Sequence, residues 1–217
     1  MFPASTEFNK RIPKTKFYEH LDISRSVKDS FVKDIDYIIW SNKIAPSTVN
    51  ISVGKTVEEI QVFRIALKGQ ELNNSVLRII DEQIPYHILF ILERGEKRLA
   101  WINYKEKAKS GDKSFRFVSS YRSEWVTEDK LDLEIEGITL DEVYTNFIKQ
   151  LVTVDDKNNW DDSKSLKENS AEIERINKIK KQIKSLEKKV KNEKQFNKKV
   201  KLNEDLKKLK RELEEQK

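Results

Sequence analysis

The sequence of 217 residues contains no cysteine, and it contains only five glycines and two histidines. Without cysteine, disulfide bonds and thiolate metal sites are excluded, and the chain suits a reducing cytoplasm. The two histidines, His20 and His87, lie 67 positions apart, which disfavours a zinc or non-haem iron centre. The few glycines form no loop of the kind that cradles phosphates. We therefore expect no metal and no cofactor.

Long apolar runs are also missing, because no run approaches the roughly 18 residues that cross a bilayer. The amino-terminal stretch MFPASTEFNKRIP lacks the apolar core of a secretion signal. Apolar residues make up 37% of the chain and charged residues another 37%, against roughly 45–50% and about a quarter in ordinary globular chains. We expect a soluble cytoplasmic protein without membrane contact, built from one domain and a charged appendage.

Positive charge is concentrated at the carboxyl end of the chain. Residues 171–217 contain 17 Lys and Arg against 9 Asp and Glu, which leaves 26 against 28 for residues 1–170. The net charge of +6 therefore belongs to the tail. A basic helical tail on a neutral domain is a weaker indication of nucleic-acid binding than a uniformly basic protein.

The densest apolar material lies between residues 60 and 104. Residues 60–67 are apolar at nearly every position around Arg64, as in a strand inside a sheet. Residues 87–92 form a second apolar run. Between the two runs, helical spacing links Leu72, Val76, Leu77, Ile80 and Ile84. A strand, a helix and a strand within about 33 residues predict a parallel pair with a right-handed crossover.

Further elements are predicted on both sides of this stretch. The turn Arg94-Gly95-Glu96 predicts a hairpin between two antiparallel strands. Other strands are expected at residues 37–44, 98–104 and 114–126, and helices at residues 14–21, around Val27, Phe31 and Ile35, and from Leu140 to Leu151. The sequence predicts an α/β (α+β) domain over residues 1–154, with a mixed sheet of four to five strands and flanking helices.

The tail follows a polar linker, residues 155–170, and Ser170 is a candidate helix N-cap. Apolar residues then alternate spacings of three and four in two blocks, Ile176 to Val190 and Leu202 to Leu213, which is the pattern of a coiled-coil seam. The blocks are out of phase with each other. One long helix with a stutter and an antiparallel helical hairpin with a turn near residues 193–197 both fit this break. We favour the hairpin.

Catalytic candidates are few. A metal-dependent nuclease of the restriction-endonuclease type needs an acid on one strand and an acid-X-Lys triplet on a neighbouring strand. Lys68 ends a suitable strand and Asp36 and Glu58 are available acids, but Ala66 occupies the triplet's acidic position. We expect His20 to be a surface or capping residue and His87 to make a structural hydrogen bond. The sequence therefore identifies no complete catalytic site.

Two basic clusters are candidates for nucleic-acid contact. Lys10, Arg11, Lys14 and Lys16 precede Phe17 and Tyr18, a combination of charge and aromatic rings that suits phosphates and bases. In the tail, the corresponding candidates are Lys181, Lys184, Lys188 and Lys191. The alternative in both places is a solvated surface that keeps the protein soluble.

The chain resembles a prokaryotic family described only as domain of unknown function 4391. The resemblance rests on five blocks in the same order: FNKRIPKTKFYEHL, WSNKIAPSTVNI, EIQVFRIALK, VLRIIDEQIPYHILFIL and EKQFNKKVKLNEDLKKLKRELE. It covers nearly the whole length. It implies no activity and no catalytic residues. It does imply an accessory protein encoded beside DNA methyltransferases and helicase-like restriction subunits, in restriction-modification or phage defence.

The leading hypothesis is therefore a non-enzymatic accessory protein that binds a methyltransferase or helicase-like partner, with DNA or RNA contact or self-association through residues 171–217. The alternative hypothesis is a divergent metal-dependent nuclease.

Overall fold

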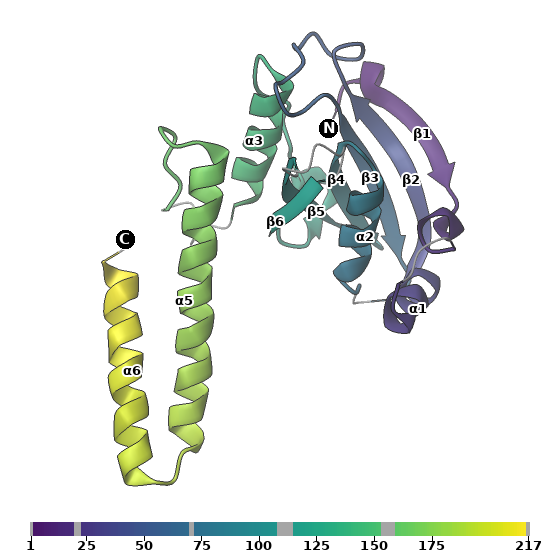
Figure 1. The fold of residues 1–217 in the computed structure, drawn as a ribbon. Helices are drawn as coiled ribbons and strands as arrows, with labels where there is room; N and C mark the ends of the chain where they lie inside the picture. The colour runs from purple at the N-terminus through teal and green to yellow at the C-terminus, as the bar shows by residue number, and fades with distance from the viewer. Residues whose placement is uncertain (1, 20–22, 70–71, 108–114, 153–158, 216–217) are drawn as a thin grey trace. The chain divides into compact units, whose positions relative to one another are not determined.

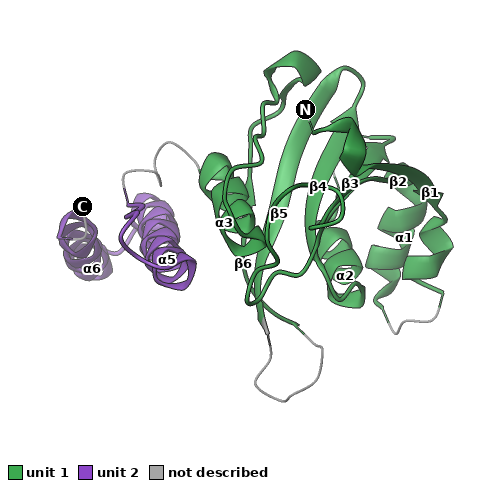
Figure 2. Cartoon of the chain, turned by 90° about the horizontal axis from the view of Figure 1, so that it is seen from above, with its two compact units in different colours: residues 1–153 green, residues 154–217 purple. Residues whose placement is uncertain are grey.

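The computed structural model describes residues 2–19, 23–69, 72–107, 115–152 and 159–215. The chain forms two compact units, residues 1–153 and 154–217 (Figures 1 and 2). The first unit contains η1 (Ala4–Thr6), β1 (Glu7–Ile12), η2 (Lys14–Phe17), α1 (Arg25–Lys33), β2 (Ile35–Ile44), β3 (Ile60–Leu67), α2 (Ser75–Gln83), β4 (His87–Arg94), β5 (Lys97–Lys107), β6 (Phe115–Arg122), β7 (Val126–Thr127), η3 (Glu128–Lys130) and α3 (Leu140–Leu151). The second contains α5 (Leu166–Asn192) and α6 (Phe196–Glu214).

A seven-stranded sheet in the order β1-β2-β3-β4-β5-β6, with β7 also paired to β5, organises the first unit. Among the strand pairs of the described residues, β3 and β4 are parallel, with α2 between them in the chain, and the other pairs are antiparallel. The predicted mixed sheet and its crossover are thus confirmed. The expected strand number of four to five was too low, because β1 is an exposed edge strand without apolar alternation and β7 has two residues.

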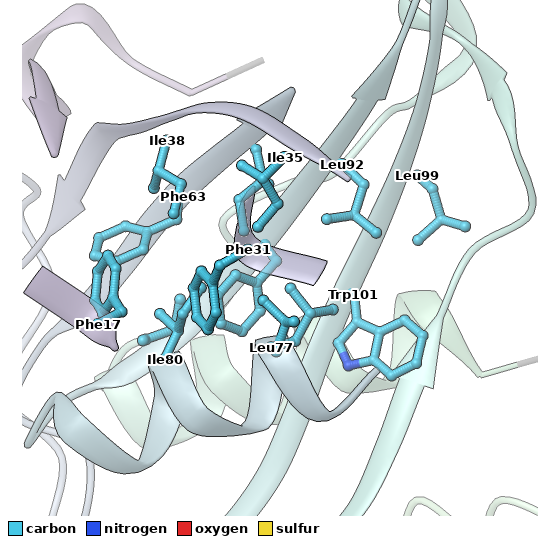
Figure 3. Close-up of a cluster of buried hydrophobic side chains, with 14 of the residues drawn as sticks. Phe17, Phe31, Ile35, Ile38, Phe63, Leu77, Ile80, Leu92, Leu99 and Trp101 are labelled. Atoms are coloured by element: carbon cyan, nitrogen blue, oxygen red, sulfur yellow. The ribbon is translucent and has the colours of Figure 1, made fainter. Parts of the chain in front are cut away.

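The central pair β3 and β4 is buried on both faces, as their apolar sequences predict. Gly95, with φ of 56°, makes the predicted hairpin turn into β5. One face of the sheet packs against η2, α1 and α2, and Figure 3 shows part of this core. Its fully buried members include Phe31, Phe90 and Ile80, each worth roughly 1.5–3 kcal/mol of stability.

Helix α3 lies beside β5 and β6, and Figure 2 shows it on the other side of the sheet from α1 and α2. The Tyr144 hydroxyl of α3 donates to the backbone oxygen of Asn103 in β5 at 2.6 Å. The ring of Phe2 packs edge-on against Phe147, with 5.8 Å between centroids. The first unit therefore has three layers, with helices on both faces of the sheet.

A loop before β3 is fixed to the start of α3 by one carboxylate. Asp141 accepts hydrogen bonds from the backbone N–H groups of Lys55, Thr56 and Val57 and from the Thr56 hydroxyl. Gly54 permits this approach, because a Cβ there would lie 2.7 Å from the backbone nitrogen of Asp141. Partial burial acts to raise the pKa of Asp141, but these hydrogen bonds outweigh it and lower the pKa.

Three local expectations differ from the structure. Ile35 begins β2, although its spacing from Phe31 suggested a helix, which ends at Lys33. The segment expected as a helix over residues 14–21 contains the short 3₁₀ helix η2, and residues 20–22 lie outside the described residues. Ser170 is not an N-cap: it is fully buried inside α5, and Ser165 caps that helix in a capping box with Glu168.

The second unit is the predicted helical hairpin. Helices α5 and α6 are separated by Glu193 to Gln195 and run antiparallel (Figure 1). Ion pairs join Arg175 to Glu212 at 3.7 Å and Glu187 to Lys210 at 2.8 Å. The apolar stripe of α5 is buried at Ile173, Ile176, Ile179 and Ile183. In the described parts of the chain, no helix combines the length and apolarity that a membrane-spanning segment needs.

We predict that Asp141→Asn destabilises the protein at pH 7 by about 1–2 kcal/mol, because the amide offers one acceptor oxygen to donors that now share two. The carboxylate's folded pKa is lowered, so its contribution is present above its unfolded pKa of about 3.9 and is lost as the pH falls through the folded pKa. Urea unfolding from pH 7 to pH 3 measures both effects. The exposed Asp132→Asn is the control, and a difference that stays constant with pH would contradict the prediction.

Candidate nucleic-acid interface

The most deeply buried ion pair joins Lys105 of β5 to Asp81 of α2. The Lys105 ammonium donates to Asp81 Oδ1 at 2.9 Å, and the two side chains are 3% and 5% exposed. Burial lowers the pKa of Lys105 and raises the pKa of Asp81, while the charge of each partner opposes the shift of the other. Shifted pKa values of this kind are often found in active sites.

The neighbours of this pair indicate a structural role instead. Lys105 also donates to the backbone oxygens of Asp81 and Tyr86, at 3.0 and 2.7 Å, where α2 ends and turns into β4. Asn103 donates to Asp81 Oδ2 at 3.2 Å and accepts from Trp101 and Ser120. The pair thus satisfies carbonyl groups that a helix end leaves without partners, and its atoms are enclosed by the protein. We assign it to the fold.

A second charged cluster crosses the sheet face opposite α1 and α2. Glu93 of β4 is buried and pairs with Arg64 of β3 at 2.5 Å, and Arg98 of β5 lies 3.4 Å away. Tyr37 of β2 donates to the other Glu93 oxygen at 3.4 Å, and Arg98 also pairs with Glu128. A cavity of about 50 Å³ lies over the cluster, walled by Phe2, Val62, Ile91, Leu131 and Leu133. That volume is too small for a metabolite, because small-molecule sites are typically about 300–1,000 Å³.

The nuclease candidates are only partly brought together. Asp36 and Lys68 lie at the same end of the sheet, because Ile35 pairs with Leu67. Glu58 precedes β3, so the eight residues of that strand separate it from Lys68, about 26 Å of chain. The Lys68 ammonium donates to the backbone oxygen of Val32 at 3.1 Å. Within the described ranges, no three histidine or carboxylate side chains are grouped closely enough to hold a metal ion.

The structure describes one of the two histidines, His87. His87 is buried, with its ring against Tyr144 and Phe115 at 4.4 and 5.1 Å between centroids. His20 lies outside the described residues.

Part of the amino-terminal basic cluster contacts β2. Lys14 donates to the backbone oxygen of Ile35 at 2.6 Å, just beyond the carboxyl end of α1. Burial, Lys68 and Arg11 lower the pKa of Lys14, and Asp36 opposes them. Arg11 lies 5.5 Å from the centre of the Tyr37 ring. Lys10, Arg11 and Lys16 are exposed, and Lys14 is half-buried. The structure therefore leaves three of the four predicted cations at the surface.

The tail candidates are arranged differently. Lys181, Lys184, Lys188 and Lys191 are all exposed, and their spacings of three and four place them on one face of α5. Glu187, which pairs with Lys210 of α6, lies three residues after Lys184 and four before Lys191, so the row runs along the side of α5 next to its contacts with α6. All four lysines are exposed, and the hairpin thus presents a row of ammonium groups at its surface.

The sequence did not predict two clusters of charged side chains, the Lys105–Asp81 ion pair and the network around Glu93. A charged residue inside an apolar strand was the available signal at Arg64 and Glu93. Their partners, however, depend on which strands become neighbours.

Comparison with protein families matches residues 1–213 to a model described as Domain of unknown function (DUF4391). Comparisons with curated proteins and with solved structures give no significant match.

We predict that Lys105→Met destabilises the protein by about 3–5 kcal/mol, because the Asp81 carboxylate stays buried without its cation. Urea unfolding at pH 7 measures the change. Lys33→Met is the control, since Lys33 and its partner Asp29 are both exposed and such pairs contribute at most about 1 kcal/mol. A loss for Lys105→Met as small as that of the control would show that the pair does not hold α2 on the sheet.

Proposed function

The chain belongs to the DUF4391 family, which carries no assigned activity, and we propose that it is a non-enzymatic accessory protein whose hairpin binds nucleic-acid phosphates. The observation that carries the proposal is the row of exposed lysines on α5, from Lys181 to Lys191. At 1.5 Å per residue this row spans about 15 Å. Each strand of a duplex presents about four phosphates over that length.

The net charge of the hairpin segment also supports nucleic-acid binding. The segment 171–217 carries a net charge of +8 from 17 basic and 9 acidic residues. A surface of this kind attracts polyanions without reading their sequence, and the counterions released on binding make the affinity fall steeply with salt. Contacts of this kind position a protein on DNA or RNA but perform no chemistry.

The first unit supplies the surface for a protein partner in this proposal. The resemblance to proteins encoded beside DNA methyltransferases and helicase-like subunits supports a partner of that kind, in restriction-modification or phage defence. The chain would then add a nucleic-acid contact to a larger enzyme. Self-association through residues 171–217 is a further arrangement that the same helices allow.

The test removes the lysine row from the full-length protein. We expect replacement of Lys181, Lys184, Lys188 and Lys191 by Gln to weaken binding of a fluorescein-labelled 20-base-pair duplex at least tenfold at 50 mM KCl. The slope of log K against log salt should become shallower by up to about 3.6, or 0.9 per lost phosphate contact. Fluorescence anisotropy between 50 and 200 mM KCl measures both quantities.

The matched control replaces four exposed lysines of the first unit by Gln, which changes the net charge equally: Lys33, Lys55, Lys97 and Lys130. Equal loss in both variants would show that general charge, not the hairpin row, drives binding. Divergent metal-dependent nuclease activity is the alternative function, favoured only by the shared sheet end of Asp36 and Lys68. DNA or RNA cleavage with Mg²⁺ or Mn²⁺ that disappears in Lys68→Ala would replace the accessory proposal.

A further inference from the structure

The end of the hairpin next to its connecting turn contains a wide groove that both helices line. Its volume is about 710 Å³, within the range of about 300–1,000 Å³ in which ligand-binding clefts fall. Each helix contributes two exposed lysines, Lys188 and Lys189 from α5 and Lys198 and Lys201 from α6. The acidic residues of the lining are Glu193 and Asp205. Four cations against two carboxylates give the groove a net charge of +2, so it favours an anionic occupant.

The other lining residues suit phosphates better than bases. Ser185 and Asn192 bring a hydroxyl and an amide, which are side chains that often hydrogen-bond phosphate oxygens. Leu202 is the apolar member, and no aromatic ring is among the described residues that line this groove. Without such a ring, the groove offers no platform on which an unpaired base could stack. Its chemistry therefore suits a chain of phosphates.

One residue connects the groove to the lysine row of α5. Lys188 belongs to the row that runs from Lys181 to Lys191, and it also lines the groove together with the two lysines of α6. A polyanion held by the row therefore lies beside cations of the second helix as well.

We propose that the groove holds one sugar-phosphate strand of a nucleic acid, contacted by lysines of both helices and recognised through its backbone and not its bases. The inference rests on the proposed function and names the part of the nucleic acid that is bound. Since phosphates line every strand, a duplex and a single strand both offer this ligand. Backbone contacts of this kind are independent of sequence.

Two other occupants fit the groove less well. A second copy of the hairpin would bring together two segments of net charge +8, which repel each other. An anionic membrane surface suits a helix with lysines on one face and a broad apolar face on the other. In this groove Leu202 is the apolar residue of the lining, and the cations surround a concavity.

The first test removes a negative charge from the groove. Asp205→Asn should tighten binding of the fluorescein-labelled 20-base-pair duplex by roughly threefold at 50 mM KCl, because a carboxylate near the bound phosphates repels them. Glu204→Gln is the matched control: it changes the net charge equally at the neighbouring position, but Glu204 is exposed and does not line the groove. Its effect should be smaller. Fluorescence anisotropy with full-length protein measures both.

The second test removes the lysines of α6 from the groove. Replacement of Lys198 and Lys201 by Gln should weaken duplex binding at least about fivefold and make the slope of log K against log salt shallower by up to about 1.8, or 0.9 per lost contact. The control replaces Lys207 and Lys208 by Gln, two exposed lysines of the same helix outside the groove lining. This control should lose less affinity and keep a steeper slope.

The third test separates the backbone from the bases. A 20-nucleotide strand in which every base is replaced by an abasic analogue should bind within about twofold of a 20-nucleotide oligothymidylate, because neither offers a base that the groove stacks. Binding of the abasic strand that is tenfold weaker would overturn backbone recognition.

The remaining outcomes separate this inference from the proposed function. If no nucleic acid binds, both fail. If the duplex binds and depends on the α5 row, but the groove variants behave like their controls, the inference fails while the proposed function stands. Binding of inorganic polyphosphate that depends on Lys198 and Lys201, without binding of any nucleic acid, would overturn the inference in favour of free polyphosphate.

Discussion

The backbone oxygens where α2 ends and turns into β4 impose the constraint on which this part of the first unit depends. They lie where the protein encloses Lys105, whose side chain is 3% exposed, and an unpaired buried carbonyl is destabilising. Lys105 of β5 donates to the backbone oxygens of Asp81 and Tyr86 there. At the more exposed end of α1, Lys68 donates to the backbone oxygen of Val32, and Lys14 donates to that of Ile35, which begins β2. A cation there also interacts favourably with the helix dipole.

This use of lysine divides the basic residues into two groups. One group is held in the fold, and the pKa of Lys105 and of Lys14 is lowered mainly because burial disfavours the charged form. The other group is exposed on the hairpin, where the lysine row of α5 lies outside the buried isoleucine stripe. Net charge alone would count all of them alike. Their surroundings show which ones are available to a polyanion.

Strong periodicities made much of the fold predictable from the sequence. The runs at residues 60–67 and 87–92 predicted the buried parallel pair. The phase break between Val190 and Leu202 fitted both a long helix with a stutter and the favoured hairpin, and the structure has the hairpin. Weak periodicities did not suffice: five of the six residues of β1 are exposed, so no apolar alternation marks this strand. The partners of Lys105 and Glu93 could not be predicted from the sequence for a different reason. They come from distant positions, 24 residues apart for Lys105 and Asp81, and only the strand order brings them together.

The central claim is that the hairpin lysines, and not those of the first unit, contact nucleic acid. Lysine acylation footprinting of the full-length protein, with and without the 20-base-pair duplex, tests it in one experiment read out by mass spectrometry. The account predicts that the duplex protects Lys181, Lys184, Lys188 and Lys191, while the exposed Lys10 and Lys16 react as in the free protein. Protection of Lys10 and Lys16, with unchanged reactivity along the hairpin, would contradict it.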